Sequence, residues 1–238
     1  MDVFALHIGN GIIEGPVAAA FGAVAIVSLA VCVARSRAEL DDRLAPMAGL
    51  VAAFVFAAQM LNFPIFTAAV SGHLIGATLA ATLVGPWVGA LCLSVVLIIQ
   101  ALVFADGGVT ALGLNVTNMA LVGTAVGYLL VALLLRILPR SNAGLAATAF
   151  VAALLSVLAA AMSFVAEYAI GGAMDLGGSI TVLAGTVAGT HLLIGVGEGV
   201  ITAVTVVAVA KVRPDLVYAL RRSRRPAQES VVTAGSPS

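Results

Sequence analysis

Residues 144–168 read GLAATAFVAALLSVLAAAMSFVAEY, a stretch of 25 residues in which Glu167 is the only charged side chain. A helix needs about 17–25 predominantly apolar residues to cross the hydrocarbon core of a bilayer. The apolar run is continuous rather than alternating, which is typical of a membrane helix and not of a strand in a β-barrel. The stretch therefore predicts a transmembrane α-helix.

The composition of the whole chain agrees with this stretch. Of its 238 residues, 62% are hydrophobic and only 9% are charged, whereas a soluble domain carries about 25% charged residues. This excludes a soluble globular protein, and the high hydrophobicity excludes a disordered one. The formal net charge is +0, so no field for binding nucleic acid is expected. We predict an all-α integral membrane protein that crosses the plasma (inner) membrane several times and contacts lipid.

Seven apolar segments are predicted to form the transmembrane bundle. They are residues 16–34, 47–64, 73–84, 87–104, 117–135, 144–168 and 181–210, separated by turn residues or charges. Three regions follow from this division. We expect an external N-terminal segment over residues 1–15, a transmembrane domain over 16–210, and a basic cytoplasmic tail over 211–238 that is partly disordered.

The lysines and arginines follow only the first, fifth and seventh segments. They are Arg35, Arg37, Arg43, Arg136, Arg140, Lys211, Arg213, Arg221, Arg222, Arg224 and Arg225. In a bundle of seven helices these three ends lie on one side, which the positive-inside rule places in the cytoplasm. The N-terminus is then predicted to lie outside and the C-terminus inside.

Acidic residues and histidines gather at or near the opposite side. They are Asp2, Glu14, Asp106, Glu167, Asp175, His7 and His73. An outer mouth with carboxylates and imidazoles, and without lysine or arginine, attracts cations. The alternative is that the acids are ordinary solvated loop residues.

Polar side chains within the apolar segments are a second group of candidates, because they are costly in a bilayer and tend to mark sites or pathways. Those predicted to line a cavity or support a site are Gln59, Asn62, Ser71, Asp106, Asn115, Asn118, His191 and Glu198. Two alternatives are open. One is that His191 and Glu198, which are seven residues apart on one helical stripe, form a hydrogen-bonded pair that ties helices together. The other is that Asn115 and Asn118 cap or brace their helix.

The segment FADGGVTALGLNVTNMA, residues 104–120, is predicted to form a wall of this cavity. Its two glycines, Gly107 and Gly108, indicate a turn or a break in a helix. Irregular backbone at membrane depth is tolerated only where protein buries it or where it lines a cavity.

His73 is the strongest candidate ligand. It follows Gly72 at the start of a segment and has little nearby with which to pair. Imidazole nitrogens suit nickel, cobalt, copper and zinc. The glycine-rich stretch LHIGNGIIEGP, residues 6–16, can fold back into the outer cavity and bring His7 to His73.

Signatures of catalysis are missing from the sequence. There is no G-x-x-x-x-G-K-[ST] loop, since the only lysine is Lys211 and Val212 follows it, and there is no H-E-x-x-H or G-x-S-x-G. The chain is therefore predicted not to be an enzyme and not to hydrolyse ATP.

Three stretches resemble one known family. They are FVFAAQMLNFPIFTAAVSGHLIGATLAATLVGPWVGAL (54–91), FADGGVTALGLNVTNMA (104–120) and HLLIGVGEG (191–199). The resemblance extends from His7 to about Ala210. It is to the CbiM/NikM family, the substrate-capturing S components of energy-coupling factor transporters of the ABC type.

The resemblance implies a seven-helix S component that imports divalent cobalt, for cobalamin biosynthesis, or nickel. Co²⁺ or Ni²⁺ is then the substrate, and no cofactor is expected. The implied partners are a transmembrane T component, two cytoplasmic ATPase subunits and usually a small accessory membrane subunit.

The resemblance also implies a ligand set. In the family the mature chain begins with methionine and histidine; the terminal amine, the histidine's backbone amide and its imidazole chelate the metal, and the histidine of an SGH motif completes the site. His7 and His73 match the two histidines, and the backbone of Leu6 stands in the place of the first residue. Because five residues precede Leu6, a free amine requires translation from Leu6 or removal of the leader; otherwise another donor, such as Asp2, serves.

The first apolar segment carries small residues four apart, among them Ala18 and Gly22, which permit close helix contacts. The resemblance implies that this face docks the T component, and the alternative is packing within the chain. Two other functions are open: an S component for a different small substrate such as a vitamin, and a membrane scaffold that transports nothing.

Overall fold

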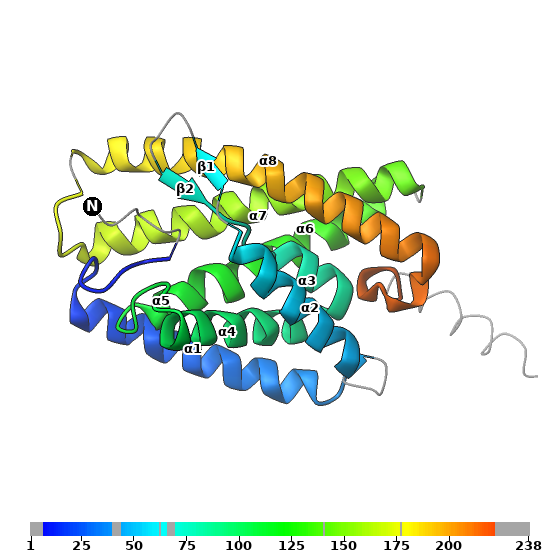
Figure 1. Ribbon diagram of the computed structural model, residues 1–238, viewed down its shortest axis with the longest axis horizontal. Helices are drawn as coiled ribbons and strands as arrows, with labels where there is room; N and C mark the ends of the chain where they lie inside the picture. Colours follow the sequence, from blue (N-terminus) through cyan, green and yellow to red (C-terminus); the bar gives the residue numbers. More distant parts are fainter. Residues whose placement is uncertain are drawn as a thin grey trace, which may run out of the picture.

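The computed structural model describes residues 7–39, 44–61, 63–65, 70–139, 141–176 and 178–221, and most of them are helical (Figure 1). The elements are α1 (Gly15–Ser36), α2 (Leu44–Gln59), β1 (Phe63–Ile65), β2 (Val70–Gly72), α3 (Ala77–Val84), α4 (Pro86–Val103), α5 (Leu112–Asn115), the π-helix η1 (Val116–Val122), α6 (Gly123–Ile137), α7 (Asn142–Gly171), α8 (Ile180–Val212) and the 3₁₀-helix η2 (Pro214–Leu216).

Five helical segments are long and apolar enough to cross a membrane within the described residues. They are α1, α4, the continuous run from α5 through η1 to α6, α7 and α8. Helix α2 has 16 residues and α3 only 8, so the prediction of about seven transmembrane helices is confirmed only as an all-helical bundle of five long helices and two shorter ones.

Local sequence explains where these helices begin. Ser141 and Ser179 are the N-caps of α7 and α8, and their hydroxyl groups accept hydrogen bonds from the backbone N–H groups of Gly144 and Val182. Pro86 occupies the first position of α4, where a missing N–H costs nothing. This proline also separates α3 from α4, as the sequence predicted.

Between α2 and α3 the chain forms a β-hairpin that the sequence analysis did not predict. Strands β1 and β2 pair antiparallel, with Phe63 opposite Gly72 and Ile65 opposite Val70. The predicted second segment, which extended to residue 64, ends as a helix at Gln59. The predicted third segment begins as a helix at Ala77, which leaves residues 73–76 as a loop.

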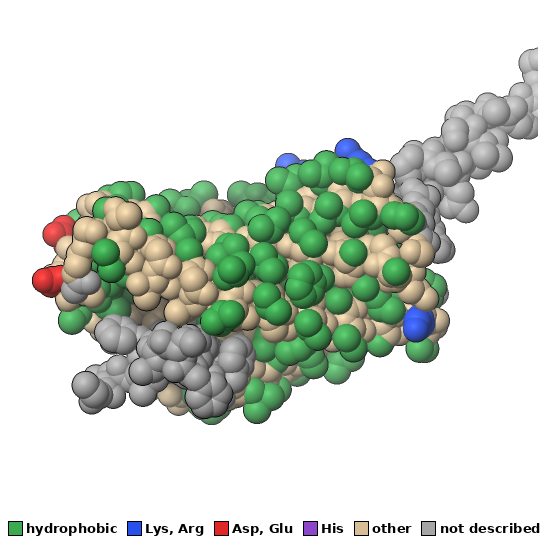
Figure 2. All heavy atoms as spheres, turned by 90° about the horizontal axis from the view of Figure 1, so that it is seen from above, with side chains coloured by type: hydrophobic (Ala, Val, Ile, Leu, Met, Phe, Trp, Pro, Cys, Tyr) green, Lys and Arg blue, Asp and Glu red, His purple; other side chains and the backbone are tan. Residues whose placement is uncertain are grey.

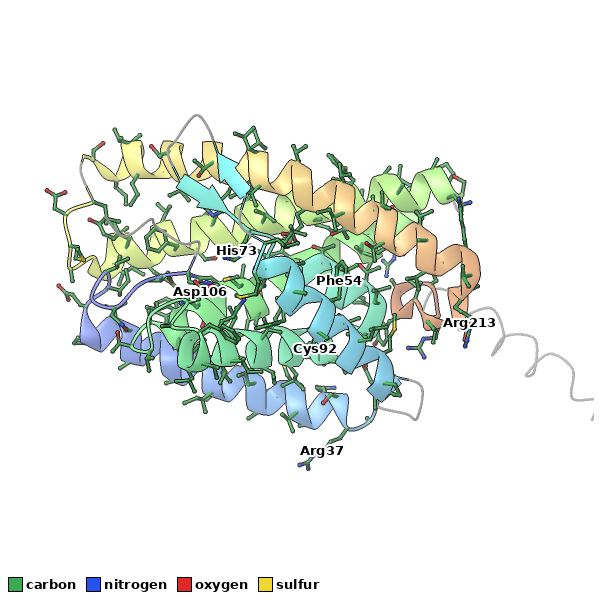
Figure 3. All side chains as sticks on the ribbon, in the orientation of Figure 1. Arg37, Phe54, His73, Cys92, Asp106 and Arg213 are labelled. Carbon is green, nitrogen blue, oxygen red and sulfur yellow. The ribbon has the colours of Figure 1, made fainter. Side chains whose placement is uncertain are left out.

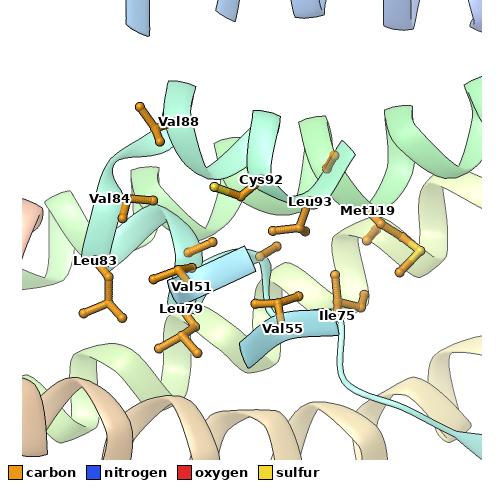
Figure 4. Packing of buried hydrophobic residues seen from close by; sticks show 14 of the residues in the cluster. Val51, Val55, Ile75, Leu79, Leu83, Val84, Val88, Cys92, Leu93 and Met119 are labelled. Atoms are coloured by element: carbon orange, nitrogen blue, oxygen red, sulfur yellow. The ribbon is translucent and has the colours of Figure 1, made fainter. Parts of the chain in front are cut away.

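The core lies around α3. All eight residues of this helix are buried, and they pack with side chains of α2, α4 and η1. Figure 4 shows Val55, Leu79, Leu93 and Met119 in this cluster. The outer surface of the bundle is also largely apolar (Figure 2), as expected where lipid replaces water as the solvent.

The charged side chains separate to the two ends of the molecule. Figure 2 shows acidic side chains at one end and lysine and arginine toward the other. At the basic end the chain after α8 folds back onto the bundle, where the Tyr218 hydroxyl donates a hydrogen bond to Oε1 of Glu39 (2.9 Å). The first part of the predicted tail is therefore packed against the helices, whereas residues 222–238 lie outside the described residues.

Candidate metal centre

His73 lies in the loop between β2 and α3 and is 1% exposed. Its Nδ1 is 2.8 Å from the carbonyl oxygen of Leu74. Because a carbonyl oxygen can only accept, Nδ1 carries the proton and Nε2 has a free lone pair. This Nε2 is buried and has no hydrogen-bond partner.

His7 reaches the same place from the N-terminal segment. Its ring stacks on that of His73, with 4.8 Å between ring centroids and 30° between ring planes. Its Nδ1 is 3.0 Å from Oδ1 of Asp106, and its Nε2 is also buried without a partner. Figure 3 shows His73 close to Asp106. The predicted meeting of the two histidines is thus confirmed, and each ring has one nitrogen held and one unused.

This pattern is the one that metal-ligating histidines show. Such a residue donates its second ring N–H to a carboxylate or a backbone carbonyl, which fixes the tautomer and the orientation of the ring. Asp106 is the carboxylate for His7, and Leu74 provides the carbonyl for His73.

The N-terminal segment is fixed over the centre by hydrogen bonds to the 104–120 wall. Asn115 accepts from Ile8 N (2.8 Å) and donates to Ile8 O (3.2 Å). Asn10 Oδ1 accepts from both the backbone N–H (3.0 Å) and the hydroxyl (2.8 Å) of Thr110. Further along, Ile13 forms a β-bridge with Gly172. The sequence analysis predicted that this stretch lines a cavity; in the structure it holds the segment that carries His7.

The two glycines of the wall permit this close approach. Gly107 has φ +91°, and a Cβ there would lie 2.9 Å from Cβ of His7. A Cβ on Gly108 would lie 2.5 Å from the backbone nitrogen of Asn10. Side chains at either position would displace the segment, which is the physical reason for two adjacent glycines after Asp106.

The loop that carries His73 is held from two other helices. Both oxygens of Glu198 accept backbone N–H groups, Oε2 from Ile75 (2.7 Å) and Oε1 from Gly76 (3.0 Å). From α2, Gln59 Nε2 donates to Ile75 O (2.7 Å). Gly76 has φ +77° and its missing side chain faces Val55, so the turn into α3 favours glycine.

The surroundings keep both His73 and Asp106 in the forms that a metal site needs. Burial, assisted by the nearby His7, lowers the pKa of His73 to about 4, so its imidazole is neutral at physiological pH. The hydrogen bond from His7 holds the pKa of Asp106 below its usual value, so this carboxyl is an acceptor.

Other predicted site residues have different positions. His191 Nδ1 lies 2.8 Å from the carbonyl oxygen of Val187 on its own helix, and Glu198 accepts hydrogen bonds from the 73–76 loop. The alternative of a His191–Glu198 pair is therefore wrong. Asn118 donates to Glu167 (2.7 Å) rather than to the N-terminal segment. Asn62 and Leu6 lie outside the described residues, and for Ser71 only its backbone pairing in β2 is described.

Ala18 and Gly22 both have contacts inside the chain. Ala18 packs against a small cluster with Ile8 and Leu114. Gly113 of α5 lies directly against Gly22 of α1, where a Cβ on Gly113 would come within 2.8 Å of the Gly22 nitrogen. Docking of a partner at this face stays a prediction.

The sequence analysis did not predict the burial of Glu167, and it gave no role to Gln100, one of the polar residues within the apolar segments. Glu167 was expected near the outer surface, but it is 1% exposed within α7. Gln100 in α4 is fully buried, and neither side-chain polar atom has a hydrogen-bond partner. A single acid or amide near the end of an apolar run is the only signal in the sequence, and it does not separate a buried residue from a surface one.

The described residues contain no group of three or more His, Cys, Asp or Glu side chains that could hold a metal ion. A metal held by His7 and His73 therefore requires further donors from the backbone or from outside these residues.

The fold and the centre together define a multi-pass, all-helical membrane protein with a buried imidazole pair near its acidic end. The chain belongs to the CbiM family, whose model, described as a cobalt uptake substrate-specific transmembrane region, matches residues 7–216. It is thus a substrate-specific transmembrane component for cobalt or nickel uptake, and not an enzyme.

Individual relatives agree. The chain is 41% identical over 213 residues, 89% of its length, to a putative fused nickel transport protein NikMN of Archaeoglobus fulgidus, of which it covers 68%. It is 36% identical over 239 residues to the cobalt transport protein CbiM of Geobacter sulfurreducens, with 98% of this chain and 65% of that protein covered. A crystal structure of a transition metal transporter superposes with a TM-score of 0.74 at 32% identity, over 87% of this chain and 93% of that one. These matches favour metal transport over the vitamin and scaffold alternatives.

Proposed function

We propose that His7 and His73 bind the transported Co²⁺ or Ni²⁺ at the acidic end of the bundle. The observation that carries the proposal is the pair of stacked, buried imidazoles whose Nδ1 atoms are both bonded and whose Nε2 atoms both lack a partner. A buried lone pair without a donor is costly, so each ring has one nitrogen available to a metal ion.

The separation of the rings fits one arrangement of ligands. With metal–nitrogen distances of about 2.0 Å, ring centres at neighbouring corners of a square lie about 4.5 Å apart and those at opposite corners about 6 Å. The measured 4.8 Å supports neighbouring corners. A chelate through an amine, the His7 amide and the His7 imidazole fills three successive corners with the amide in the middle. The fourth corner, for His73, then adjoins the imidazole of His7.

Asp106 has a part in this chelate. A six-membered ring closed by the His7 amide and imidazole uses Nδ1, which Asp106 holds in the structure. A half-turn of the ring about its Cβ–Cγ bond frees Nδ1 and brings Nε2–H to the side of the carboxylate. Asp106 thus lies on the side of a His7 N–H in both states, and a hydrogen bond to Nε2 requires its carboxylate to move closer. An all-nitrogen set of this kind selects Co²⁺ and Ni²⁺ over hard cations.

The N-terminal segment, residues 7–13, acts as the lid of the centre. The separation of charges between the two ends supports an external N-terminus and a cytoplasmic C-terminus by the positive-inside rule. Metal arrives from outside at the acidic end, and the segment closes over it through Asn115 and Thr110. Movement of the subunit within a complex then delivers the ion. The complex comprises a T component, two ATPase subunits and a small accessory membrane subunit.

Metal analysis of the purified protein tests the proposal. We expect near one equivalent of bound Ni²⁺ or Co²⁺ in the wild type, and loss of binding in His73→Ala and His7→Ala. His191→Ala is the matched control, because this third histidine is bonded within α8, and it should retain the metal. Retention by the first two variants would refute the assignment of ligands. A wild-type protein that binds neither ion would refute the function of the site.

A further inference from the structure

The membrane-spanning helices carry two buried glutamates whose surroundings differ. Both oxygens of Glu198 accept a backbone N–H, at 2.7 and 3.0 Å, so an ionised carboxylate is satisfied there. Glu167 is equally buried, at 1% exposed, but its one hydrogen bond comes from Nδ2 of Asn118 to Oε2 (2.7 Å). The second oxygen of Glu167 has no donor.

The Asn118–Glu167 pair has an unused acceptor on each partner. Oδ1 of Asn118 and Oε1 of Glu167 are both buried without a hydrogen-bond partner. An ionised carboxylate can only accept, so it cannot satisfy the amide oxygen. A carboxylic acid has one O–H to donate. A proton on Oε1 gives Glu167 an O–H to donate, and Oδ1 of Asn118, whose Nδ2 already donates to Oε2, is a buried acceptor without a donor.

We propose that Glu167 and Asn118 form a proton-binding site within the membrane, occupied at neutral pH, in which Glu167 is an uncharged carboxylic acid. Burial of a charged side chain in a bilayer is expensive unless it is paired, and one hydrogen bond from a neutral amide is a weak substitute for an ion pair.

The helices around Glu167 bring no cation to it among the described residues. Helix α7 packs against α1, α3, α6, η1 and α8. The basic residues Arg35, Arg136 and Lys211 occupy the last turns of α1, α6 and α8, at the end of the bundle away from Glu167. The other titratable groups on this side are bonded elsewhere or exposed. Tyr168, His191 and Glu198 are hydrogen-bonded to Met174 O, to Val187 O and to the 73–76 loop. His7 is hydrogen-bonded to Asp106, and His73 to Leu74 O. Glu14 and Asp175 are exposed.

The position of the site gives it a role in the architecture. Asn118 is three residues after Asn115, which clamps Ile8 of the N-terminal segment. The acid–amide pair ties α7 to η1 directly beside this clamp. A neutral pair does so without leaving a charge in the membrane.

Infrared spectroscopy of the full-length protein tests the proposal. We expect a protonated-carboxyl C=O band at neutral pH that shifts in D₂O, is lost in Glu167→Gln and persists in the matched control Glu198→Gln. Absence of the band, or its survival in Glu167→Gln, would overturn the proposal.

Thermal unfolding provides a second test that does not depend on metal. Glutamine at 167 reproduces the donor and acceptor of the protonated acid, so Glu167→Gln should melt close to the wild type, whereas Glu167→Ala should melt lower. Equal losses for the two variants would mean that the ionised form is needed, which contradicts the proposal. A melting temperature that rises with Na⁺ in the wild type and not in Glu167→Gln would identify a cation as the ligand instead.

Discussion

Replacement of Gly108 by alanine tests whether metal binding needs the N-terminal segment in the position that the structure gives it. The new Cβ would lie 2.5 Å from the backbone nitrogen of Asn10 and 2.7 Å from the carbonyl carbon of Gly9. These are backbone atoms, so the segment has to move as a unit and take His7 with it. The φ of Gly108 is not in the left-handed region, so alanine does not strain its own backbone.

The expected loss of affinity follows from the bonds that this movement breaks. They are Gly108 N to Ile8 O (2.9 Å) and the two bonds from Thr110 to Asn10 Oδ1 (3.0 and 2.8 Å). At about 1 kcal/mol each, loss of two or three costs about 2–3 kcal/mol. That is a decrease of about 30- to 150-fold in affinity for Ni²⁺ or Co²⁺.

Competition against a chromophoric chelator in detergent measures this affinity, and a thermal melt of the same sample reports on the bundle. The matched control is Gly9→Ala, whose Cβ would meet only Ile12 Cδ1 at 3.6 Å. The control should bind like the wild type. If Gly108→Ala binds as tightly as the control and melts at the same temperature, the segment does not present His7 to the metal and the reasoning is wrong.

Three further predictions concern the same chain. Asp106→Asn should weaken metal binding about 10- to 100-fold, as loss of an outer-shell carboxylate typically does, whereas the exposed Glu14→Gln should leave metal analysis and affinity unchanged; equal affinities would contradict the role of Asp106. Burial and the nearby His7 hold the pKa of His73 at about 4, against 6.5 for a free histidine. Between about pH 4 and 6.5 the unfolded chain therefore binds a proton at His73 that the folded chain does not. The melting temperature of the metal-free protein should therefore rise from about pH 4 to 6.5, and His73→Gln should reduce that slope. Finally, Gly22→Leu should weaken co-purification with the T component and spare metal binding, since no atom lies within 4 Å of a Cβ at Gly22; unchanged co-purification would count against docking at this face.

The sequence predicted the parts of the fold that depend on hydrophobicity and turn chemistry. Long apolar runs predicted α1, α4, α7 and α8, and the break between segments 73–84 and 87–104 matches the turn between α3 and α4. The pairing of His7 with His73 could also be anticipated, because a glycine-rich segment and a lone histidine lay on the same predicted side. Their role as ligands stays a prediction.

The parts that could not be predicted depend on contacts between distant segments. The hairpin of β1 and β2 is hidden, because apolar residues continue past Gln59 and resemble the end of a helix. Glu198 shares a helical stripe with His191, but its oxygens go to the backbone of Ile75 and Gly76, and no spacing within α8 reveals this. For Glu167, the neighbouring elements decide between burial and exposure.

The shortness of α3 has a consequence for the passage of the ion. Its eight residues measure about 12 Å along the axis, against a hydrocarbon core of about 30 Å, and Figure 3 shows His73 toward the middle of the long dimension of the molecule. On the proposed binding by His73, an ion exchanges its hydration water for protein ligands at a residue that is 1% exposed, so the cost of dehydration falls on the binding step. Helix α3 alone separates His73 from Gly85, which lies against Tyr218 at the basic end, so the proposed delivery of the ion has only a short helix to pass.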